Sequence, residues 1–405
     1  MGDDVMRSVH VARSIPRIAL SRATRPWLPS VAYGRLGPVG DRAADDRDLP
    51  GPGWVLVRNL QSGICASDLA VLRAEVDPRV TIAALPGRDR TYLGHEVVGE
   101  VLAAGAGTGL EPGERVVLDT RFQGPTCRST ETGSLCRACA AGNPMLCENP
   151  DRFPAELGVG GGWSERILCH ASEVYRVPPE LDDDQAMLVE PFSLGMRAAL
   201  KALPGPGERC LVVGGGMAGL SIVQTVRLLS PDAHITVVAR HPAQAALAEG
   251  LGADRVERRL DPARLAEPSR MFRGPLGSYF VMGGFDVVFD CVGSGPTLTT
   301  SLRLARASAT VVLVGIRFAP VKADLSPVWH QEVRLAGVLA HGWERAGEED
   351  AHTYDLVCRH LVKGDLSTDG FITDRFPLAE WRRAVARADA RADGVIRVVL
   401  DTTRG

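Results

Sequence analysis

One glycine-rich stretch constrains the fold of this chain more than any other feature. Residues 214–219 read Gly-Gly-Gly-Met-Ala-Gly and match the pattern G-x-G-x-x-G. They follow the apolar run 210–213 and precede residues 220–229, which have helical spacing. In a strand–turn–helix unit, such glycines permit a tight turn, a close approach of the backbone to a pyrophosphate and close helix packing. The context therefore predicts a dinucleotide site at Gly214, Gly216, Met217, Ala218 and Gly219.

Strands and helices continue to alternate after this turn. Apolar strand-like runs and helix-like segments follow one another at residues 235–238, 243–250, 286–291, 297–305 and 310–314. This alternation predicts a parallel sheet with helices on both faces. Residues 51–200 instead contain short β-like runs bounded by Gly, Pro or Asp, which predicts an irregular β-rich domain. The expected fold class is α/β, with a β-rich domain and a doubly wound parallel-sheet domain.

The expected domain boundaries follow from this change of pattern. Residues 1–197 form a β-rich catalytic domain, 198–330 the dinucleotide-binding domain, and 331–405 return to the catalytic domain. The strand-like runs at 333–339 and 394–400 are both assigned to the return. Residues 267–284 fit no clear element, and we expect a long surface loop or an insertion there.

Composition excludes several classes of protein. The 405 residues are 45% hydrophobic and 23% charged, which is typical of a globular protein, and the net charge is −3. No large basic field is implied, so we expect no nucleic-acid partner. No run of 18 apolar residues exists, and the N-terminus lacks an uninterrupted apolar stretch, so we expect no membrane span, no secretory signal and a cytoplasmic location.

The end of the second strand bears on the choice of dinucleotide. An NAD site usually places an acid about 20 residues after the last glycine, where it binds the ribose 2′-hydroxyl. This chain has Ala239 there, followed by Arg240 and His241. A missing carboxylate beside an arginine suits a 2′-phosphate, so NADP(H) is favoured. The alternative is a surface arginine beside a less selective NAD site.

Four of the nine cysteines lie close together in the sequence. They are Cys127, Cys136, Cys139 and Cys147. Zn²⁺ favours tetrahedral thiolate ligation, and a closed site of four thiolates is structural. The intervening residues offer little apolar surface, so a bound metal would supply folding energy. The alternative is a set of free thiols or a redox pair.

A second set of candidate ligands is more dispersed. Cys65 begins the run Cys-Ala-Ser-Asp, His95 and Glu96 follow Gly94, and Glu190 lies in an otherwise apolar run. Thiolate, imidazole and carboxylate are all zinc ligands. A buried carboxylate is also unusual without a partner. Cys65 and His95 are far apart in sequence, so spacing alone leaves a metal site and unrelated positions equally open.

Taken together, these motifs resemble the zinc-containing medium-chain dehydrogenase/reductase superfamily of the alcohol dehydrogenase type. The nearest branch contains sorbitol, threonine and glucose dehydrogenases. The resemblance spans about residues 50–400 and is carried by residues 63–68, 94–99, the cysteine cluster, 190–191, the glycine turn and 290–293. It implies a GroES-like catalytic domain, a Rossmann domain and a homodimer or homotetramer.

The resemblance also implies roles for individual residues. Cys65, His95 and Glu96 would hold a catalytic zinc, with Glu190 as a fourth ligand or a partner of the zinc-bound water. Ser67 would relay the substrate proton, and Val292 and Gly293 would lie near the nicotinamide. The four clustered cysteines would hold a second, structural zinc. The implied reaction is hydride transfer between a secondary alcohol or polyol, or its ketone, and the nicotinamide cofactor.

Three positions depart from the family pattern. Ala66 replaces a glycine, a mild change that keeps the hydroxyl of Ser67. The first cluster cysteine is expected at position 133, which is a glycine here, so Cys127 must reach back through a longer loop, or only three thiolates bind. Ala239 replaces the acid. Two alternative functions stay open: a zinc-free reductase of activated C=C bonds, and a non-catalytic nucleotide-sensing protein on the same fold.

Overall fold

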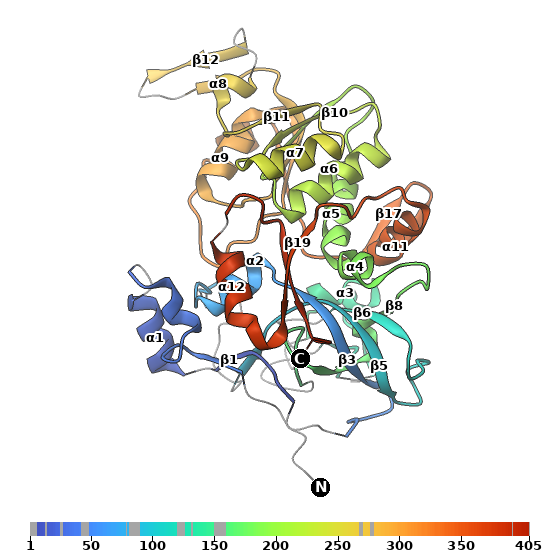
Figure 1. The fold of residues 1–405 in the computed structure, drawn as a ribbon. Coiled ribbons are helices and arrows are strands. Elements are labelled where there is room, and N and C mark those ends of the chain that lie inside the picture. The colour runs from blue at the N-terminus through green and yellow to red at the C-terminus, as the bar shows by residue number, and fades with distance from the viewer. Residues whose placement is uncertain are drawn as a thin grey trace. The chain divides into compact units, whose positions relative to one another are not determined.

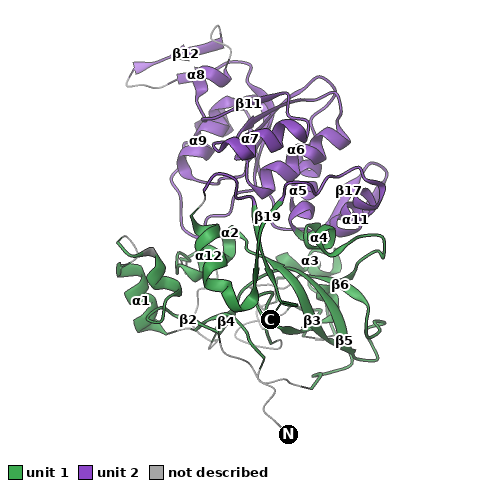
Figure 2. Cartoon of the chain, in the orientation of Figure 1, with its two compact units in different colours: residues 1–190, 372–391, 397–405 green, residues 191–371, 392–396 purple. Residues whose placement is uncertain are grey.

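The computed structural model divides the chain into two compact units. Unit 1 comprises residues 1–190, 372–391 and 397–405, and unit 2 comprises residues 191–371 and 392–396 (Figure 2). The expected catalytic domain ended at residue 197 and resumed at 331, so the observed division differs at both boundaries. The structure describes all residues except 1–5, 13, 25–26, 42–47, 78, 81–89, 120–125, 131–132, 150–158, 267–269, 276–278, 391 and 405.

Unit 1 is built on a seven-stranded sheet whose main path runs β19-β20-β3-β5-β6-β8, with β7 paired to β3. Its strands are β3 (Trp54–Gly63), β5 (Glu96–Ala104), β6 (Arg115–Asp119), β7 (Arg166–His170), β8 (Val174–Arg176), β19 (Ile372–Pro377) and β20 (Arg397–Asp401). Alternate side chains such as Val55, Val97 and Ile167 meet in one buried core, as expected for strands with one face inward. The β-like runs of the sequence are therefore real strands of one sheet.

Smaller elements surround this sheet. A second sheet joins β2 (Val39–Gly40), β1 (His10–Ala12) and β4 (Arg90–Tyr92). The helices of unit 1 are α1 (Ile15–Thr24), α2 (Ala66–Leu72), α3 (Arg137–Ala140), α4 (Asp183–Met187) and α12 (Trp381–Asp389). Short 3-10 turns are η1 (Pro29–Tyr33), η3 (Pro144–Leu146), η5 (Ala171–Glu173) and η8 (Leu378–Glu380). Of these, α12 packs against β19 and β20.

Unit 2 contains a six-stranded parallel sheet in the order β11-β10-β9-β14-β15-β16. The strands are β9 (Arg209–Val213), β10 (His234–Val238), β11 (Arg255–Glu257), β14 (Phe285–Asp290), β15 (Ala305–Leu313) and β16 (Arg334–Gly337). The helices are α5 (Val189–Lys201), α6 (Met217–Leu229), α7 (Pro242–Gly250), α8 (Pro262–Leu265), α9 (Gly295–Leu304), α10 (Ser326–His330) and α11 (Thr353–Lys363). Figure 1 labels β10 and β11 of this sheet, with helices α6 and α7 beside them. The predicted alternation of strands and helices, and the α/β class, are confirmed.

Two expectations about local structure need correction. The strand-like run 333–339 was assigned to the first domain, but β16 pairs in parallel with β15 and extends the sheet of unit 2. Short α10 supplies the crossover that a parallel neighbour requires. Residues 267–284 are not simply a long loop, because their described part contains the antiparallel strands β12 (Met271–Arg273) and β13 (Tyr279–Val281), while residues 267–269 and 276–278 lie outside the described residues. The alternative, an insertion, stays a prediction. Phe272 and Phe280 on these strands are exposed, so this hairpin lacks the alternating burial by which a strand is predicted. A second hairpin joins β17 (Trp343–Ala346) and β18 (Glu349–His352).

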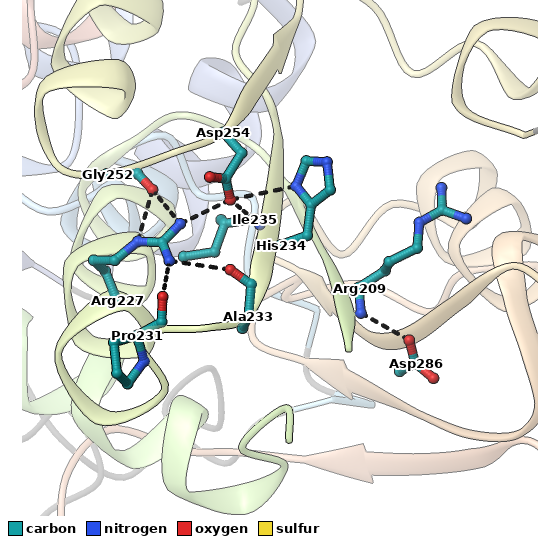
Figure 3. A network of polar contacts seen from close by, with 9 residues as sticks. All are labelled: Arg209, Arg227, Pro231, Ala233, His234, Ile235, Gly252, Asp254 and Asp286. Atoms are coloured by element: carbon teal, nitrogen blue, oxygen red, sulfur yellow. Dashed lines mark hydrogen bonds and ion pairs between the residues drawn. The ribbon is translucent and has the colours of Figure 1, made fainter. Parts of the chain in front are cut away.

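A polar network fixes the N-terminal end of β10 (Figure 3). Arg227, near the end of α6, donates to the Gly252 carbonyl at 2.8 Å and pairs with Asp254 at 2.7 Å. Asp254 also accepts from the Ile235 amide at 2.7 Å. Burial opposes ionisation of Asp254, but the Ile235 amide and Arg227 outweigh it and lower the pKa of Asp254. The glycine turn lies at the opposite end of this sheet. No helix within the described ranges is long and apolar enough to cross a bilayer.

Candidate metal centres and dinucleotide site

Cys65 lies where a strand ends and a helix begins. It is the N-cap of α2, and its backbone N–H donates to the Asp68 carboxylate at 2.9 Å. Asp68 is fully buried, and its other oxygen accepts from the Gly94 N–H at 2.9 Å. One carboxylate therefore ties the segment carrying Cys65 to the segment carrying His95 and Glu96. Gly94 has φ +84°, and a Cβ there would lie 2.6 Å from the Trp163 ring, so glycine is required.

The structure brings three of the predicted ligands together. One ligand atom each from Cys65, His95 and Glu96 lies within 4.8 Å of the others. Tetrahedral zinc with bonds of about 2.0–2.3 Å holds its ligands roughly 3.5 Å apart, so small side-chain movements would close this group on one ion. Glu190 is not a member of the group. It is half-buried in the same unit, and its charge acts on Arg397.

The surroundings of His95 favour metal binding through one ring nitrogen. Its Nδ1 lies 3.4 Å from Asp68 Oδ1, and its Nε2 lies 3.4 Å from the Ser67 hydroxyl. A carboxylate on one nitrogen of a ligating histidine fixes the ring and leaves the other nitrogen for the metal. Burial opposes a charge on His95, but Asp68 and Cys65 raise its pKa well above the ordinary value. Asp68 and Cys65 therefore favour positive charge at this position.

Glu96 forms a buried ion pair that the sequence did not reveal. Arg397 Nη2 lies 3.0 Å from Glu96 Oε1, and the two side chains are 6% and 1% exposed. Arg397 also donates to the Ile64 carbonyl at 2.7 Å. The second oxygen of Glu96, Oε2, is buried without a hydrogen-bond partner among the described residues. An unsatisfied buried carboxylate oxygen is costly, so this atom fits the role of a metal ligand.

Arg397 is surrounded by negative groups. Burial opposes its charge, but Glu96, Cys65, Glu190 and Asp68 together raise its pKa above the ordinary value. The guanidinium therefore stays positive and offsets part of the negative charge of the pocket. Asp68 and Arg397 are the two residues of this site that motif reasoning did not assign a role. The sequence does not show that the Asp68 carboxylate and the Arg397 guanidinium are buried; only the folded structure does.

The four clustered cysteines also come together. The sulfur atoms of Cys127, Cys136, Cys139 and Cys147 all lie within 4.8 Å of one another. Cys127 Sγ is 3.6 Å from Cys147 Sγ, too far for a disulfide and suited to a shared metal. Cys127 thus completes the group despite its unusual spacing. The core of this lobe consists of the cysteines themselves, so without a metal it has little apolar stabilisation.

Backbone amides support the thiolate form of one cysteine in the lobe. Cys136 is the N-cap of α3, and its sulfur accepts from the Glu148 and Cys139 N–H groups, both at 3.4 Å. These amides lower the pKa of Cys136 to about 6. Metals bind the thiolate rather than the thiol, so this local structure favours metal binding.

The predicted glycine turn has the geometry that a dinucleotide needs. Gly214 has φ +114°, and a Cβ on Gly219 would lie 1.8 Å from the Gly214 carbonyl oxygen, so both positions require glycine. Gly216 is the N-cap of α6, and a Cβ there would meet nothing within 4 Å. Open space at a helix N-terminus suits a phosphate, because the free N–H groups and the helix dipole favour an anion.

Two further strand ends flank this turn. After β10, Ala239 is fully buried, Arg240 is exposed, and His241 is the N-cap of α7. After β14, Val292 and Gly293 both donate to Asp290 Oδ1 at 3.0 Å, and Gly293 has φ +68°.

Asp290 is itself fully buried, and burial raises its pKa. Because it accepts from both amides, it fixes the segment predicted to meet the nicotinamide, a positioning role that sequence reasoning missed. The sequence reasoning placed Asp290 within a family motif but gave it no task of its own.

Comparison with known proteins identifies the family. Residues 51–179 match the family model described as "Alcohol dehydrogenase GroES-like domain", and residues 218–352 match "Zinc-binding dehydrogenase". Together with the relatives below, these matches show that the chain belongs to the zinc-containing medium-chain dehydrogenase/reductase superfamily. The predicted pairing of a GroES-like domain with a Rossmann domain is confirmed, and the protein is an oxidoreductase.

The relatives are similar over most of their length. D-arabinitol dehydrogenase 1 of Uromyces fabae is 26% identical over 83% of this chain and 87% of its own. An L-threonine 3-dehydrogenase of Anaeromyxobacter dehalogenans is 28% identical over 86% of this chain and 90% of its own. A solved putative zinc-binding dehydrogenase of Sinorhizobium meliloti, bound to NADP, has a TM-score of 0.70 at 24% identity, covering 98% and 99% of the two chains.

Proposed function

We propose that this protein is a zinc-dependent dehydrogenase that transfers a hydride between a secondary alcohol or polyol, or the matching ketone, and NADP(H). The observation that carries the proposal is that Cys65, His95 and Glu96 each bring one ligand atom within 4.8 Å of the others. Glu96 also has a buried oxygen, Oε2, with no hydrogen-bond partner among the described residues. The residues present fit zinc, because they offer sulfur, imidazole nitrogen and oxygen. Bound there, zinc would act as a Lewis acid toward a substrate oxygen.

The protein side chains then have separate tasks. Asp68 would orient His95 through Nδ1, and Arg397 would hold one oxygen of Glu96 and leave the other for the metal. Ser67, which is buried and lies 3.4 Å from His95 Nε2, is placed to pass the substrate proton toward solvent. Glu190 would serve as a fourth ligand or as the partner of a bound water.

The cysteine cluster is proposed as a second zinc site with a structural task. Four sulfur ligands close the coordination sphere and leave no position for substrate. We therefore expect two zinc ions per chain, one catalytic at Cys65, His95 and Glu96, and one structural in the lobe. We also expect the protein to form a homodimer or homotetramer.

NADP(H) is the proposed cofactor because the segment that follows β10 has no carboxylate at the position that usually binds the ribose. Ala239 occupies the position of the usual ribose-binding acid, and the guanidinium of Arg240 lies 3.4 Å from His241 Nε2. A carboxylate would repel a 2′-phosphate, whereas an arginine can bind it with two hydrogen bonds. The named relatives include sorbitol, D-arabinitol, L-idonate and L-threonine dehydrogenases, which supports an alcohol or polyol substrate.

A cofactor-reduction screen tests the proposal. Purified protein is offered secondary alcohols, polyols, sugars and amino alcohols with NAD⁺ or NADP⁺, beside the variants Cys65→Ser and Cys358→Ser. Cys358 is a buried cysteine that belongs to neither cluster, so it is the control for the same chemical change away from the site. We expect turnover with at least one alcohol, abolished only by Cys65→Ser. Reduction of an activated C=C bond by both variants at the wild-type rate would instead support a zinc-free reductase.

A further inference from the structure

Arginines follow the ends of two neighbouring strands of unit 2. β10 and β11 run in parallel with Val238 opposite Glu257, and the Ala239 N–H donates to the Glu257 carbonyl at 2.9 Å. This register places the residues after each strand side by side at the edge of the sheet that carries the glycine turn. Arg240 follows β10, and Arg258 follows β11; both side chains are exposed.

Arg258 is held against the loop that follows β10. Its Nη2 donates to the backbone carbonyl of Arg240. A guanidinium has five N–H donors in a planar fork, so one bond to a carbonyl fixes its position and leaves most donors available. Within the described ranges, neither Arg240 nor Arg258 forms an ion pair with a carboxylate.

Two carboxylates lie near this edge, and both are already engaged. The Glu257 side chain is 14% exposed and pairs with Arg255 at 2.7 Å and with Arg264 at 3.5 Å. Asp393 accepts from the Ala243 N–H at 3.1 Å, in the first turn of α7. Among the described residues, neither carboxylate forms an ion pair with Arg240 or Arg258. The two exposed arginines therefore present positive charge at this end of the sheet, and such charge attracts an anion.

We propose that Arg258 and Arg240 together form the binding site for the 2′-phosphate of the adenosine ribose, with Arg258 as a determinant of specificity. This inference rests on the proposed function, in which the dinucleotide lies on the glycine turn. A phosphate monoester carries nearly two negative charges near neutral pH and three acceptor oxygens, which two guanidinium groups can satisfy. Arg258 supplies the second cation from a strand that motif reasoning did not associate with the cofactor.

Direct binding measurements test the inference without any need for turnover. Calorimetry compares NADP⁺, NAD⁺ and 2′,5′-ADP on the wild type, Arg258→Gln, Arg258→Lys and Arg273→Gln. Arg273 is an exposed arginine on β12 and serves as the matched control for loss of charge. We expect Arg258→Gln to weaken NADP⁺ and 2′,5′-ADP by about tenfold or more, with NAD⁺ within about twofold of the wild type. Arg258→Lys should recover part of the loss, and Arg273→Gln should change nothing.

Other results would overturn the inference, and they separate it from the proposed function. Equal weakening of NAD⁺ and NADP⁺ would show that Arg258 only supports the loop, and an unchanged NADP⁺ affinity would show that it has no role. If Arg240→Gln removes the preference for NADP⁺ while Arg258→Gln keeps it, this inference fails and the proposed cofactor stands. If the wild type binds NAD⁺ and NADP⁺ equally, the proposed cofactor preference fails, and this inference fails with it.

Discussion

Arg397 and Glu96 are buried side chains far apart in the sequence, and they meet 3.0 Å apart, Nη2 to Oε1. Arg397 begins β20 and Glu96 begins β5, so the sheet of unit 1 brings the two strand starts together. The pair fixes one oxygen of Glu96 and leaves the other without a hydrogen bond among the described residues. The shape of the proposed metal site therefore depends on a residue near the end of the chain.

Removing this arginine should destabilise the protein and disturb the metal site. Arg397→Gln leaves the buried Glu96 carboxylate without its cation, and breaking one partner of a buried pair costs about 3–5 kcal/mol. We expect a lower free energy of unfolding by urea denaturation and less zinc bound per chain. Arg58→Gln is the control, because Arg58 pairs with Glu100 on the same sheet but is 52% exposed. If Arg397→Gln and Arg58→Gln lowered the unfolding free energy and the zinc content equally little, the proposed role of Arg397 would be wrong.

Cys127→Ser should release the structural zinc. Its sulfur lies 3.6 Å from that of Cys147, so we expect all four thiolates to share the ion. The variant should bind one zinc fewer per chain and unfold at a lower temperature. Cys169→Ser, which changes a buried cysteine of the same unit outside the cluster, should keep its zinc. Full zinc content in Cys127→Ser would mean that three thiolates suffice.

Alanine substitutions at Gly216 and Gly219 should have different effects: the first should weaken dinucleotide binding, and the second should lower stability. A Cβ on Gly216 meets nothing within 4 Å, whereas one on Gly219 lies 1.8 Å from a backbone oxygen. Gly216→Ala should therefore unfold at the wild-type temperature but bind NAD⁺ and NADP⁺ about tenfold more weakly, since it blocks the phosphate position. Gly219→Ala should lower the unfolding free energy by about 1–3 kcal/mol. Tight dinucleotide binding by Gly216→Ala would argue against the proposed site.

Asp254 should make stability depend on pH in the acid range. Its pKa is lowered in the folded state, so its contribution is present above the unfolded-state pKa of about 4 and is lost as the pH falls through the folded-state value. Asp254→Asn should cost about 1 kcal/mol at pH 7, because the side chain is 43% exposed and screened by water. The difference from the wild type should shrink as the pH falls below 4. Asp350→Asn, at a 69% exposed position, should show no such trend.

The sequence predicted those features that depend on local patterns. The glycine turn, the strands around it and the cysteine cluster could be predicted because each is encoded within a short stretch. The grouping of Cys65 with His95 and Glu96 was predicted only from the family resemblance, because their spacing alone left it open. Three roles could not be predicted, because they depend on burial and on contacts between segments. Asp68 bridges two segments, Arg397 pairs with Glu96, and Asp290 positions the segment that follows it. The hairpin at 271–281 also escaped prediction, because Phe272 and Phe280 are exposed opposite each other rather than alternating with polar residues.

The strand at the edge of the parallel sheet shows a second limit. Residues 334–337 read as a strand from the sequence, but nothing local distinguishes a sixth parallel strand from a strand of the first domain. Only pairing with β15 assigns it to unit 2. Strand pairing depends on residues that are far apart in the sequence. The existence of a strand can therefore be predicted more readily than the strands that lie beside it.

Cys65, His95 and Glu96 are proposed to hold a zinc ion that the reaction requires. The most direct test of this proposal is the zinc content of the wild type, Cys65→Ser and Cys127→Ser, measured beside alcohol turnover. We predict two zinc ions in the wild type and one in each variant, with turnover lost completely in Cys65→Ser. Two zinc ions and wild-type turnover in Cys65→Ser would contradict the proposal.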